Sequence, residues 1–498
     1  MCGFVGFANF EKDISNEKYI LKSMNNTLFR RGPDEQGYYI DKNVAFAHKR
    51  LVVIDPEGGK QPMVEKYSFG TYVMIYNGQI YNTKELKKVL LENNFELQGH
   101  SDTEILLKSY IYYGNDVVKY LNGIFAFAIW DTQKNQIFLA RDHFGVKPLF
   151  YTIIDKTLVF SSEIKGLLEY PGVKKVLNSQ GISELFGIGP AHTPGLSVFK
   201  DIFEIKPAHF AIYNHSGLHL EQYWKLISKE HTDSLGQTCE HLKFLLNDSI
   251  TKQLVADVPL CTFLSGGLDS SIITKFASDY YEANLMPPLD TYSIDYVDND
   301  KNFVKSDFQP NSDNFYIDLV QKKLKTNHHK IIIDTPELAD ALEDAMVARD
   351  VPGMADIDSS LLLFCKNVKK EKTVALTGEC ADEIFGGYPW FFRQDALTSN
   401  TFPWSISLDE RQKLLNLSIG KEISLKEYID FRYNESLDKV EILPTDSKET
   451  AEKRKISYLT LNWFMQTLLE RSDRMAMYNG VELRVPFCDY RLAEYVWN

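Results

Sequence analysis

The chain has 498 residues and a formal net charge of −13, and 44% of its residues are hydrophobic and 25% charged. It is too long for a single core, so we expect two or three domains, and its composition is that of a globular protein. The negative charge argues against non-specific binding to nucleic acid or anionic membranes, so we expect neither as a partner.

The cysteines and the N-terminal segment predict a cytoplasmic protein. The six cysteines are scattered without a CxxC pair, which is typical of a reducing compartment rather than of a disulfide framework or a zinc site. The N-terminus lacks the basic start and the long apolar core of a secretory signal. No apolar run approaches the roughly 18 residues that a membrane-spanning helix needs.

The first two residues allow two interpretations. Removal of Met1 would leave Cys2 with both a thiol and a free α-amine, that is, a nucleophile beside a base whose reference pKa is about 7.7–8.0. The alternative is that Cys2 is a small apolar residue at the start of a buried strand. The opening stretch by itself favours the alternative.

The first ~200 residues predict short strands separated by turns. Two segments, 83–94 and 101–114, instead show apolar residues at three- and four-residue spacing and predict helices. The predicted strands are 2–8, 36–40, 44–54, 72–82, 123–131, 136–142, 148–154 and 157–163. This pattern indicates an α+β domain of stacked antiparallel sheets with helices attached, which we place at residues 1–222.

The rhythm changes after a polar stretch, 222–237, that is suited to a linker. The predicted strands that follow are 258–264, 289–296, 328–334 and 373–379, and the predicted helices are 270–281, 336–349 and 358–371. Strands that alternate with helices indicate a parallel sheet wrapped by helices, an α/β domain at residues 236–498. Such sheets bind ligands beyond the carboxyl ends of their strands. Residues 298–314 are predicted to form a polar loop insertion.

The strongest local motif is "FLSGGLDSS", residues 263–271. A strand runs into glycines and serines and then into a helix, so backbone N–H groups, hydroxyls and the helix N-terminus can cradle a phosphate or pyrophosphate. Asp269 would repel phosphate unless a metal bridges the two, so we assign it to Mg²⁺. The alternative is a glycine-rich turn with a helix cap.

A second motif, "LTGECADEIFGGY" at 376–388, follows another predicted buried strand. Its acids, Glu379, Asp382 and Glu383, are costly at a strand end unless they meet a cation or handle protons. The alternative is a capped helix with two of these acids in its first turn, and the motif alone does not decide between them.

Polar residues of the first half suggest further roles, each with a simpler alternative. Arg50 could bind a carboxylate or lie on the surface. Asn77 and the Gly78 N–H could form an oxyanion hole or a hairpin turn. Asp102 could bind an ammonium group or cap a helix. The pair His328-His329 opens a strand without partners at metal-ligand spacing, so we interpret it as structural.

These motifs, together with "RGPD", "RLVVID", "NGQIYN", "SDTE", "ARDHFGVKPLFY", "SSEIK" and "RSDRMAMYNGVELRVPFCDYRL", occur in one order along the chain. In that order they resemble glutamine-dependent asparagine synthetases across nearly the whole sequence. The resemblance implies a class II glutamine amidotransferase domain of the N-terminal-nucleophile hydrolase type, joined to an ATP-pyrophosphatase domain. It also implies a possible homodimer.

At the first site the resemblance implies that Cys2 attacks the side-chain amide of glutamine while Asn77 and Gly78 hold the oxyanion. Arg50 would bind the substrate carboxylate and Asp102 its ammonium group. The implied glutamine-binding residues are Arg50, Leu51, Val53, Asn77, Gly78, Gln79 and Asp102. Ammonia would then pass through an internal tunnel to the second site.

At the second site the resemblance implies that ATP adenylates L-aspartate with release of pyrophosphate, and that ammonia then displaces AMP. Asp269 and Asp382 would bind Mg²⁺, and Glu379 would handle a proton during the attack of ammonia. The implied ATP-binding residues are Leu264, Ser265, Gly266, Gly267, Asp269, Ser270, Ser271, Ile294, Thr377 and Gly378.

Three departures from the family pattern are present. The usual "NGE" is Asn77-Gly78-Gln79 here, and the usual "SGEGSDE" is "TGECADE" at 377–383, which keeps the acids. The sequence stops at Asn498 within an expected helix, whereas relatives continue for on the order of a hundred residues, so we expect the second domain to be incomplete at its C-terminal end.

Two other functions stay open from the sequence. One is amidation of a different carboxylate, such as a cell-wall or peptide acid. The other is a non-catalytic sensor of glutamine or nucleotide, against which the presence of Cys2, Arg50, Asp269 and Asp382 together argues. We expect the acceptor to be lined by a loop at 349–360, whose acids Asp356 and Asp358 fit poorly with an aspartate substrate.

Overall fold

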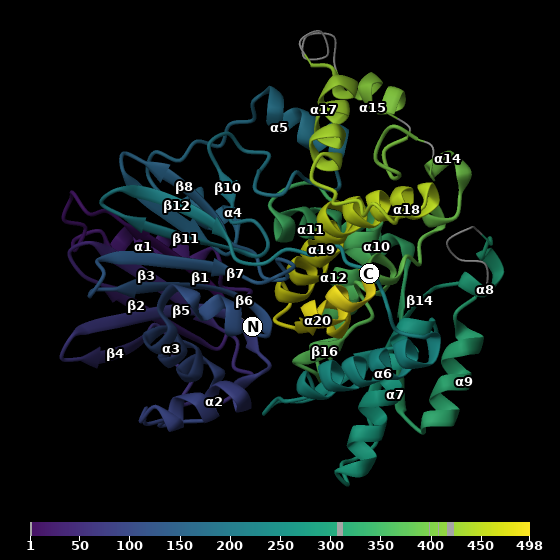
Figure 1. Ribbon diagram of the computed structural model, residues 1–498, viewed down its shortest axis with the longest axis horizontal. Helices are drawn as coiled ribbons and strands as arrows, with labels where there is room; N and C mark the ends of the chain where they lie inside the picture. The colour runs from purple at the N-terminus through teal and green to yellow at the C-terminus, as the bar shows by residue number, and fades with distance from the viewer. Residues whose placement is uncertain (1, 306–311, 398, 407, 416–422) are drawn as a thin grey trace.

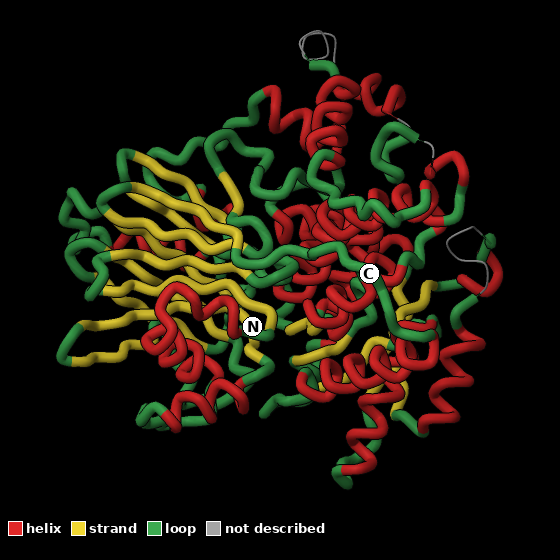
Figure 2. The backbone as a smooth tube through the Cα atoms, viewed as in Figure 1, coloured by secondary structure: helices red, strands yellow, loops and turns green. Residues whose placement is uncertain are grey.

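The computed structural model describes residues 2–305, 312–397, 399–406, 408–415 and 423–498. The N-terminal part is rich in strands and lies beside a largely helical C-terminal part (Figure 1 and Figure 2). Of the helices that can be examined in these ranges, none has both the length and the apolar character needed to cross a bilayer.

The N-terminal part, as described, contains two six-stranded antiparallel sheets that pack face to face. The first sheet has the order β10 (Phe203–Glu204), β8 (Phe150–Ile154), β9 (Thr157–Ser161), β1 (Gly3–Ala8), β3 (Val44–Arg50) and β2 (Glu35–Ile40). The second has the order β12 (Gly217–Gln222), β11 (His209–Asn214), β7 (Gln136–Arg141), β6 (Gly123–Asp131), β5 (Gly70–Ile80) and β4 (Met63–Tyr67).

Strand β1 shows why this part of the sequence is apolar without alternation. Its Phe4 and Ala8 pack into the core between the two sheets, whereas Val5 and Phe7 pack against helices on the outer face. Because successive side chains of a strand point to opposite faces, a strand covered on both faces is apolar throughout. The helices that cover the sheets are α1 (Lys18–Asn26), α4 (Ile164–Leu167), α2 (Thr83–Glu92), α3 (Asp102–Tyr113) and η1 (Gly114–Tyr120).

The C-terminal part is built on a parallel sheet, five-stranded as far as it is described. Its order is β15 (Asn327–Ile333), β14 (Asp290–Tyr296), β13 (Leu260–Phe263), β16 (Val374–Leu376) and β17 (Glu482–Arg484). The main helices around it are α6 (Leu235–Lys252), α7 (Leu268–Ala283), α9 (Asn314–Leu324), α10 (Thr335–Asp340), α11 (Leu342–Arg349), α12 (Asp356–Val368) and α19 (Met465–Met477). Apolar side chains of the sheet pack on α12 and α19, so the strands are covered by helices as expected for a parallel sheet.

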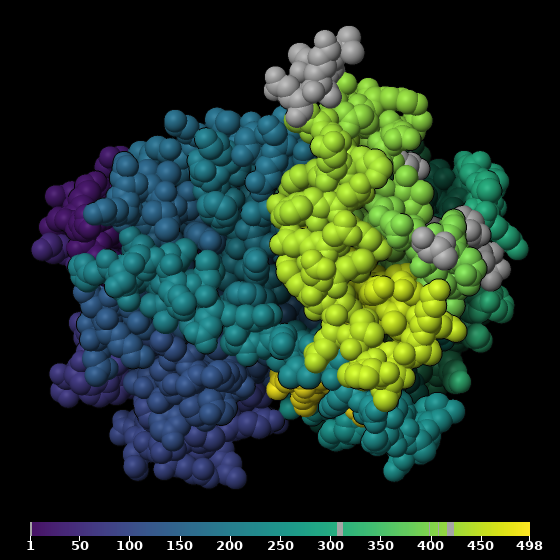
Figure 3. Space-filling model, turned by 45° about the horizontal axis from the view of Figure 1, so that its top comes forward, coloured from purple at the N-terminus to yellow at the C-terminus, as the bar shows by residue number. Residues whose placement is uncertain are grey.

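Shorter elements complete the described chain. Between the domains and before the second motif these are α5 (Ser179–Ser183), η2 (Glu184–Ile188) and α8 (Asn299–Asn302). After it they are α13 (Ala381–Phe385), η3 (Pro389–Phe391), α14 (Gln394–Leu397), α15 (Leu408–Leu414), α17 (Leu425–Leu437), α18 (Lys448–Leu459), η4 (Thr460–Phe464), η5 (Pro486–Cys488) and α20 (Tyr490–Val496). In the space-filling view the yellow-green residues of this region lie along the boundary with the N-terminal part (Figure 3).

The fold class predicted from the sequence is confirmed: stacked antiparallel sheets with helices, followed by a parallel sheet wrapped by helices. Some predicted elements are wrong in extent. The strand predicted at 44–54 ends at Arg50. The acceptor loop predicted at 349–360 includes the first turn of α12, which begins at Asp356. Part of the predicted loop insertion, 306–311, lies outside the described residues.

The two parts share one hydrophobic core. Leu51, Val53 and Ile124 of the N-terminal part belong to the same buried cluster as Leu461 and Met465 of the C-terminal part. A buried ion pair crosses the same boundary, because Asp473 of α19 accepts from the Arg31 Nη1 atom at 2.6 Å. We call this boundary between the N-terminal and C-terminal parts the seam. It is formed by apolar packing around paired charges and is not a loose contact between domains.

Candidate active sites

Cys2 lies just before β1 and is held from three directions. Its backbone N–H donates to the Asn77 Oδ1 atom at 2.9 Å, its carbonyl accepts from Arg31 Nε at 3.0 Å, and its thiol donates to the Leu51 carbonyl at 3.9 Å. The residue is 8% exposed, and burial raises the pKa of its thiol. A thiol fixed in this way needs a base at hand to become a nucleophile.

Asn77 and Gly78 lie inside β5, so the hairpin-turn alternative for this pair is wrong. The Asn77 side chain is fully buried, and its Nδ2 atom has no hydrogen-bond partner among the described residues, although its Oδ1 atom is engaged by Cys2. A Cβ at Gly78 would lie 2.1 Å from the Ile124 carbonyl, so only glycine fits there. A buried amide donor without a partner beside a thiol is suited to an oxyanion.

Arg50 is not a surface residue, because only 4% of it is exposed. Its Nη1 atom donates to Glu35 Oε2 at 2.7 Å and to the Pro56 carbonyl at 2.6 Å, and its Nη2 atom donates to the Asp55 carbonyl at 2.7 Å. A substrate carboxylate would therefore share or replace the contact with Glu35. Arg50 and Glu35 line a cavity of about 460 Å³ together with His48 and Gln61.

Asp102 is the first residue of α3, whereas Ser101 caps this helix, so the cap predicted at Asp102 is wrong by one residue. Its Oδ2 atom accepts from the Tyr76 hydroxyl at 2.8 Å and from the Ile80 N–H at 3.0 Å, and burial raises the pKa of its carboxyl group. Gln79 is buried in the strand between these two partners. The remaining predicted residue, Val53, accepts through its carbonyl from the Asp257 N–H at 2.9 Å across the seam.

The predicted phosphate loop connects β13 to α7 at the carboxyl end of the parallel sheet. The Ser270 hydroxyl lies 3.0 Å from the Ser265 hydroxyl and accepts from the Ser265 N–H at 3.2 Å. Gly266 has a φ of 82°, and a Cβ there would lie 3.0 Å from the Asp313 carbonyl, so the turn requires glycine. Helix α7 begins at Leu268, and the residue before it, Gly267, offers no side-chain cap, which leaves the helix N-terminus to a ligand or water.

The second motif meets this loop in space. Gly378 lies against it, since a Cβ there would be 3.1 Å from the Asp269 Cβ atom. Burial, with Asp382 adding repulsion, raises the pKa of Asp269 to about 6. Burial and then Glu379 raise the pKa of Asp382, and burial raises that of Glu383 to about 7. Negative charge is thus concentrated where the loop would place phosphate.

This arrangement fits Mg²⁺, which is commonly held by one or two carboxylates together with substrate phosphates. Asp269 and Asp382 supply two carboxylates whose pKa values are raised by burial and by neighbouring acids, so a bound cation would favour their charged forms. In the described ranges no group of three or more His, Cys, Asp or Glu side chains forms a cage for a metal. A cation here would therefore depend on its nucleotide for further ligands.

The two motifs line one cavity of about 290 Å³. The predicted residues that line it are Ser265, Asp269, Ser270, Thr377, Gly378, Glu379 and Asp382. The other predicted ATP-binding residues do not: Leu264, Gly266, Gly267, Ser271 and Ile294. Leu264 and Ile294 are instead packed in and beside the sheet. The structure therefore brings seven of the predicted residues together in one cavity, and the roles of all of them stay predictions.

Several residues at these sites received no role from the sequence. Arg471 of α19 donates to Glu379 Oε1 at 2.9 Å, and Tyr388 donates to Glu383 Oε1 at 2.7 Å. Two residues further along α19, Asp473 pairs with Arg31, which holds Cys2. Their only sequence signal was their position in motifs shared with the family: "RGPD" for Arg31, "RSDRM" for Arg471 and Asp473, and the end of "LTGECADEIFGGY" for Tyr388.

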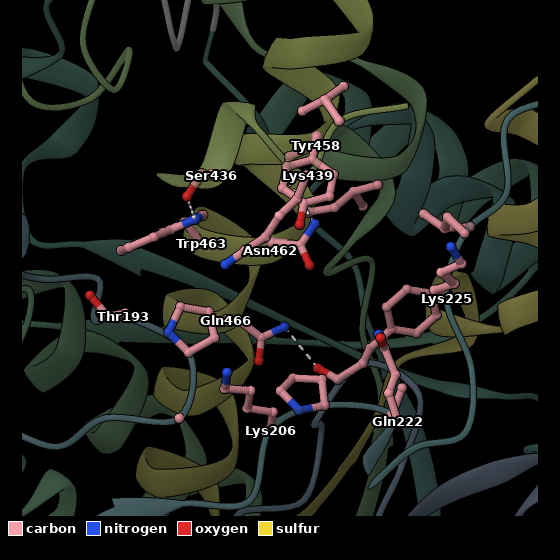
Figure 4. A pocket seen from close by; sticks show the side chains of 18 of the residues that line it. Thr193, Lys206, Gln222, Lys225, Ser436, Lys439, Tyr458, Asn462, Trp463 and Gln466 are labelled. Atoms are coloured by element: carbon pink, nitrogen blue, oxygen red, sulfur yellow. Dashed lines mark hydrogen bonds between the residues drawn. The ribbon is translucent and has the colours of Figure 1, made fainter. Parts of the chain in front are cut away.

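A cavity of about 830 Å³ lies elsewhere on the seam (Figure 4). It is lined by residues of the N-terminal part such as Thr193 and Lys206 and of the C-terminal part such as Trp463 and Gln466. The Gln466 amide donates to the Phe144 carbonyl at 2.8 Å across it. Neither Cys2 nor Asp269 lines this space, so we assign it no role in the chemistry.

Comparisons with known proteins agree with this division of the molecule. Residues 1–224 match the model of the glutamine amidotransferase domain, and residues 241–498 match that of asparagine synthase. The fold and the two sites thus define an amidotransferase that is joined to a nucleotide-dependent ligase. The chain belongs to the asparagine synthase family, and the family and enzyme class predicted from the sequence are confirmed.

Three curated relatives match at least 98% of the chain. It is 48% identical over 498 residues to asparagine synthetase [glutamine-hydrolyzing] 3 of Bacillus subtilis, covering all of this chain and 81% of that protein. It is 30% identical to asparagine synthetase [glutamine-hydrolyzing] 1 of the same organism, covering 98% of this chain and 79% of that protein. It is also 26% identical to Amidase chyE of Penicillium rubens, covering all of this chain and 82% of that protein.

Proposed function

We propose that this protein is a glutamine-hydrolysing asparagine synthetase. It converts glutamine and water into glutamate and ammonia, and then L-aspartate, ATP and ammonia into L-asparagine, AMP and pyrophosphate. The observation that carries the proposal is the single cavity in which the Ser265–Ser270 loop faces the acids of the Thr377–Asp382 motif, in a chain whose other domain buries Cys2 beside Asn77.

The glutaminase domain, which we place at residues 1–222, uses Cys2 as its nucleophile. After removal of Met1 the α-amine of Cys2 accepts the thiol proton, directly or through a water, and the thiolate attacks the amide carbon of glutamine. The free Nδ2 atom of Asn77 and the Gly78 N–H hold the oxygen as it becomes negative. Arg50 and Asp102 fix the substrate's carboxylate and ammonium groups, with Leu51, Val53 and Gln79 around them.

The synthetase domain, placed at residues 236–498, holds ATP on the loop after β13. Mg²⁺ bound by Asp269 and Asp382 would neutralise the phosphates and so favour loss of pyrophosphate. Hydroxyl groups and backbone N–H groups of residues 265–271 bind the pyrophosphate, and Leu264, Ile294, Thr377 and Gly378 surround the nucleotide. Glu379, oriented by Arg471, takes a proton from the ammonia nitrogen as the amide forms.

L-Aspartate is the acceptor that we favour over another carboxylate. The acidity that we expected of the segment around 349–360 is reduced, because Arg349 donates to Asp358 Oδ2 at 3.3 Å inside the fold. The relative named an amidase keeps the alternative of a larger carboxylate relevant. We further propose that the protein works in the cytoplasm, where its thiols stay reduced, and as a homodimer.

An acceptor screen tests the proposal. Pyrophosphate release from ATP is measured with ammonium as nitrogen donor, with L-aspartate and with larger carboxylates, and the nucleotide product is identified. We expect AMP and stimulation by L-aspartate, and we expect Asp269→Asn to abolish synthesis while glutamine hydrolysis stays within about twofold because it uses the other domain. ADP as product would exclude the assignment of the loop, and stimulation only by a larger carboxylate would exclude aspartate.

A further inference from the structure

Two cysteines that are distant in the sequence meet beside the nucleotide site. The Cys488 thiol lies 2.7 Å from the Cys380 sulfur, closer than two sulfurs that only pack against each other, and the two residues are 108 positions apart. Both thiols are free in the structure. Cys380 is 1% exposed, whereas Cys488 is partly accessible.

The backbone conformation of Cys380 suggests that the cysteine is present for more than packing. Its φ is 77°, in the left-handed region, where a residue with a side chain is disfavoured by roughly 1–2 kcal/mol relative to the ordinary helical region. Glycine would avoid this cost, so the turn itself does not call for a cysteine. Strained residues of this kind cluster at functional positions.

The position of the pair links it to the acids of the synthetase site. Cys380 follows Glu379 directly, precedes Asp382 by two residues and lines the same 290 Å³ cavity. Cys488 ends η5, and the next residue, Asp489, caps α20 by accepting from the Arg491 N–H. A bond between the two sulfurs would tie the acidic loop to the turn that leads into α20.

We propose that Cys380 and Cys488 form a redox modification site, which a hydroperoxide converts into a disulfide that restrains the acidic loop. Disulfides in reducing compartments are usually transient and redox-sensing. The modification does not depend on the proposed function, whereas its effect on activity does.

The chemistry balances with hydrogen peroxide, the simplest hydroperoxide, as oxidant. The more accessible Cys488 sulfur attacks one peroxide oxygen, the O–O bond breaks, and Cys488 becomes a sulfenic acid with release of water. The Cys380 sulfur then attacks the Cys488 sulfur, an S–S bond forms, and the sulfenic oxygen leaves as a second water. Two thiols lose two electrons and two protons, and the peroxide is reduced.

The bond requires the sulfurs to close from 2.7 Å to about 2.0 Å, and the movement falls on a loop that carries Glu379 and Asp382. Displacements on the order of 1 Å in a catalytic group can cost about a hundredfold in rate. Bound nucleotide would cover the cavity side of Cys380. We therefore expect oxidation to slow synthesis several-fold and Mg-ATP to slow oxidation.

The test uses the full chain treated with hydrogen peroxide, with and without Mg-ATP. Peptide mass spectrometry after alkylation should show Cys380 linked to Cys488, and dithiothreitol should remove the link. Ammonia-dependent pyrophosphate release should fall and recover in parallel. Ammonium is the nitrogen donor so that oxidation of Cys2 does not affect the measurement.

Two variants control for other effects of peroxide. Cys488→Ser removes one partner, and Cys380→Gly removes the other while suiting the left-handed backbone, so both should keep their activity under peroxide. Absence of the linked peptide while the exposed Cys239 is oxidised would overturn the proposal, as would linkage through another cysteine pair. Equal loss of activity in Cys488→Ser would overturn the restraint of the loop. A link that forms normally in a protein that does not bind ATP would leave the modification standing and count against the proposed function instead.

Discussion

The two candidate sites differ in how their charges and dipoles are satisfied. Around Cys2 the charged side chains that we expect to bind glutamine have protein partners. Arg50 is paired with Glu35, and Asp102 accepts two hydrogen bonds. The Asn77 Nδ2 atom has no hydrogen-bond partner among the described residues, and neither has the Nδ1 atom of His48, which lines the same cavity as Arg50. Around Asp269, Glu379 and Glu383 accept from Arg471 and Tyr388, but neither Asp269 nor Asp382 forms an ion pair within the described residues. Burial, with Asp382 adding repulsion, raises the pKa of Asp269 to about 6.

This difference follows from the chemistry that each site performs. Attack on an amide creates one negative oxygen, so the first site needs hydrogen-bond donors placed in advance, for which we propose the Asn77 amide and the Gly78 N–H. Transfer of an adenylyl group handles several phosphate charges, so we expect a bound cation to compensate Asp269 and Asp382, which form no ion pair within the described residues. The first site is prepared by the protein alone, whereas the second is completed by its substrate.

Cys2→Ala should impair the glutaminase site and leave the synthetase site intact. We expect glutamine hydrolysis to fall by about three orders of magnitude or more, because no other group supplies the nucleophile. Synthesis from ammonium should stay within about twofold. Cys2→Ser should be nearly as inactive as Cys2→Ala, since a hydroxyl is much harder to deprotonate than a thiol.

The measurement pairs glutamate release with amide formation from ammonium, and intact mass should show that Met1 is absent from the wild type. Cys365→Ser is the matched control, because that cysteine is also fully buried but lies in α12, away from the glutaminase site. It should lower both activities together through stability. Survival of glutaminase activity in Cys2→Ala would refute the nucleophile.

Asn77→Asp tests whether the Asn77 Nδ2 atom, which has no hydrogen-bond partner among the described residues, donates to the oxyanion. The variant keeps an oxygen that can accept from the Cys2 N–H but loses the Nδ2 donor and adds a negative charge near the oxyanion. We expect kcat for glutamine hydrolysis to fall about 10²–10³-fold with a smaller change in KM. If KM rose alone, the amide would serve ground-state binding and the oxyanion hole would be elsewhere.

Some parts of the molecule followed from the sequence because their patterns are local. Apolar alternation and β-branched runs located the strands around the sites, and the glycines of the phosphate loop stood between a strand and a helix as required. Strand β4 was missed because Met63–Tyr67 is half exposed and charged, and β17 because three residues carry no period.

Other parts depend on contacts between distant residues, which no local pattern contains. The pair Arg471–Glu379 joins residues 92 apart, and Arg31–Asp473 joins residues 442 apart. We expected Asp358 to add negative charge to the acceptor loop, but Arg349 donates to it and offsets that charge. The two residues meet across a turn whose geometry the sequence did not reveal. The order of the motifs predicted the family and the candidate site residues. Only the fold shows which distant side chains hold those residues in place.

Asp473→Asn tests whether α19 holds the two sites together. Asp473 is 4% exposed and accepts from Arg31 at 2.6 Å and from Lys147 at 3.1 Å. Its neutralisation leaves the buried Lys147 without its counter-charge and Arg31 with Glu163 alone. We expect a loss of about 3–5 kcal/mol in the free energy of unfolding and a fall in both activities.

The control for this variant is Asp430→Asn, which removes an exposed i, i+4 partner of Lys426 on α17. It should cost no more than about 0.5 kcal/mol. Thermal unfolding followed by circular dichroism, together with both activity assays, separates the two variants. A midpoint for Asp473→Asn equal to that of the control would show that the seam does not depend on this charge.

The smallest effect that we expect concerns a charge on the seam that lies outside both sites. Burial alone would lower the pKa of His192, but Glu204 at 3.1 Å, with Glu470 at 3.8 Å, raises it from the usual 6.5 to about 9. These two acids are themselves paired with Arg141 and Arg349. Because the folded pKa lies above the unfolded one, the stabilisation is complete below pH 6.5 and is lost as the pH rises through 9. The difference between the folded and unfolded pKa values of His192 corresponds to about 3 kcal/mol at most.

The thermal midpoint of the wild type should therefore fall by several degrees between pH 6.5 and 9.5, and that of His192→Gln should fall less. Parallel curves for the two proteins would mean that His192 is not charged in the folded state.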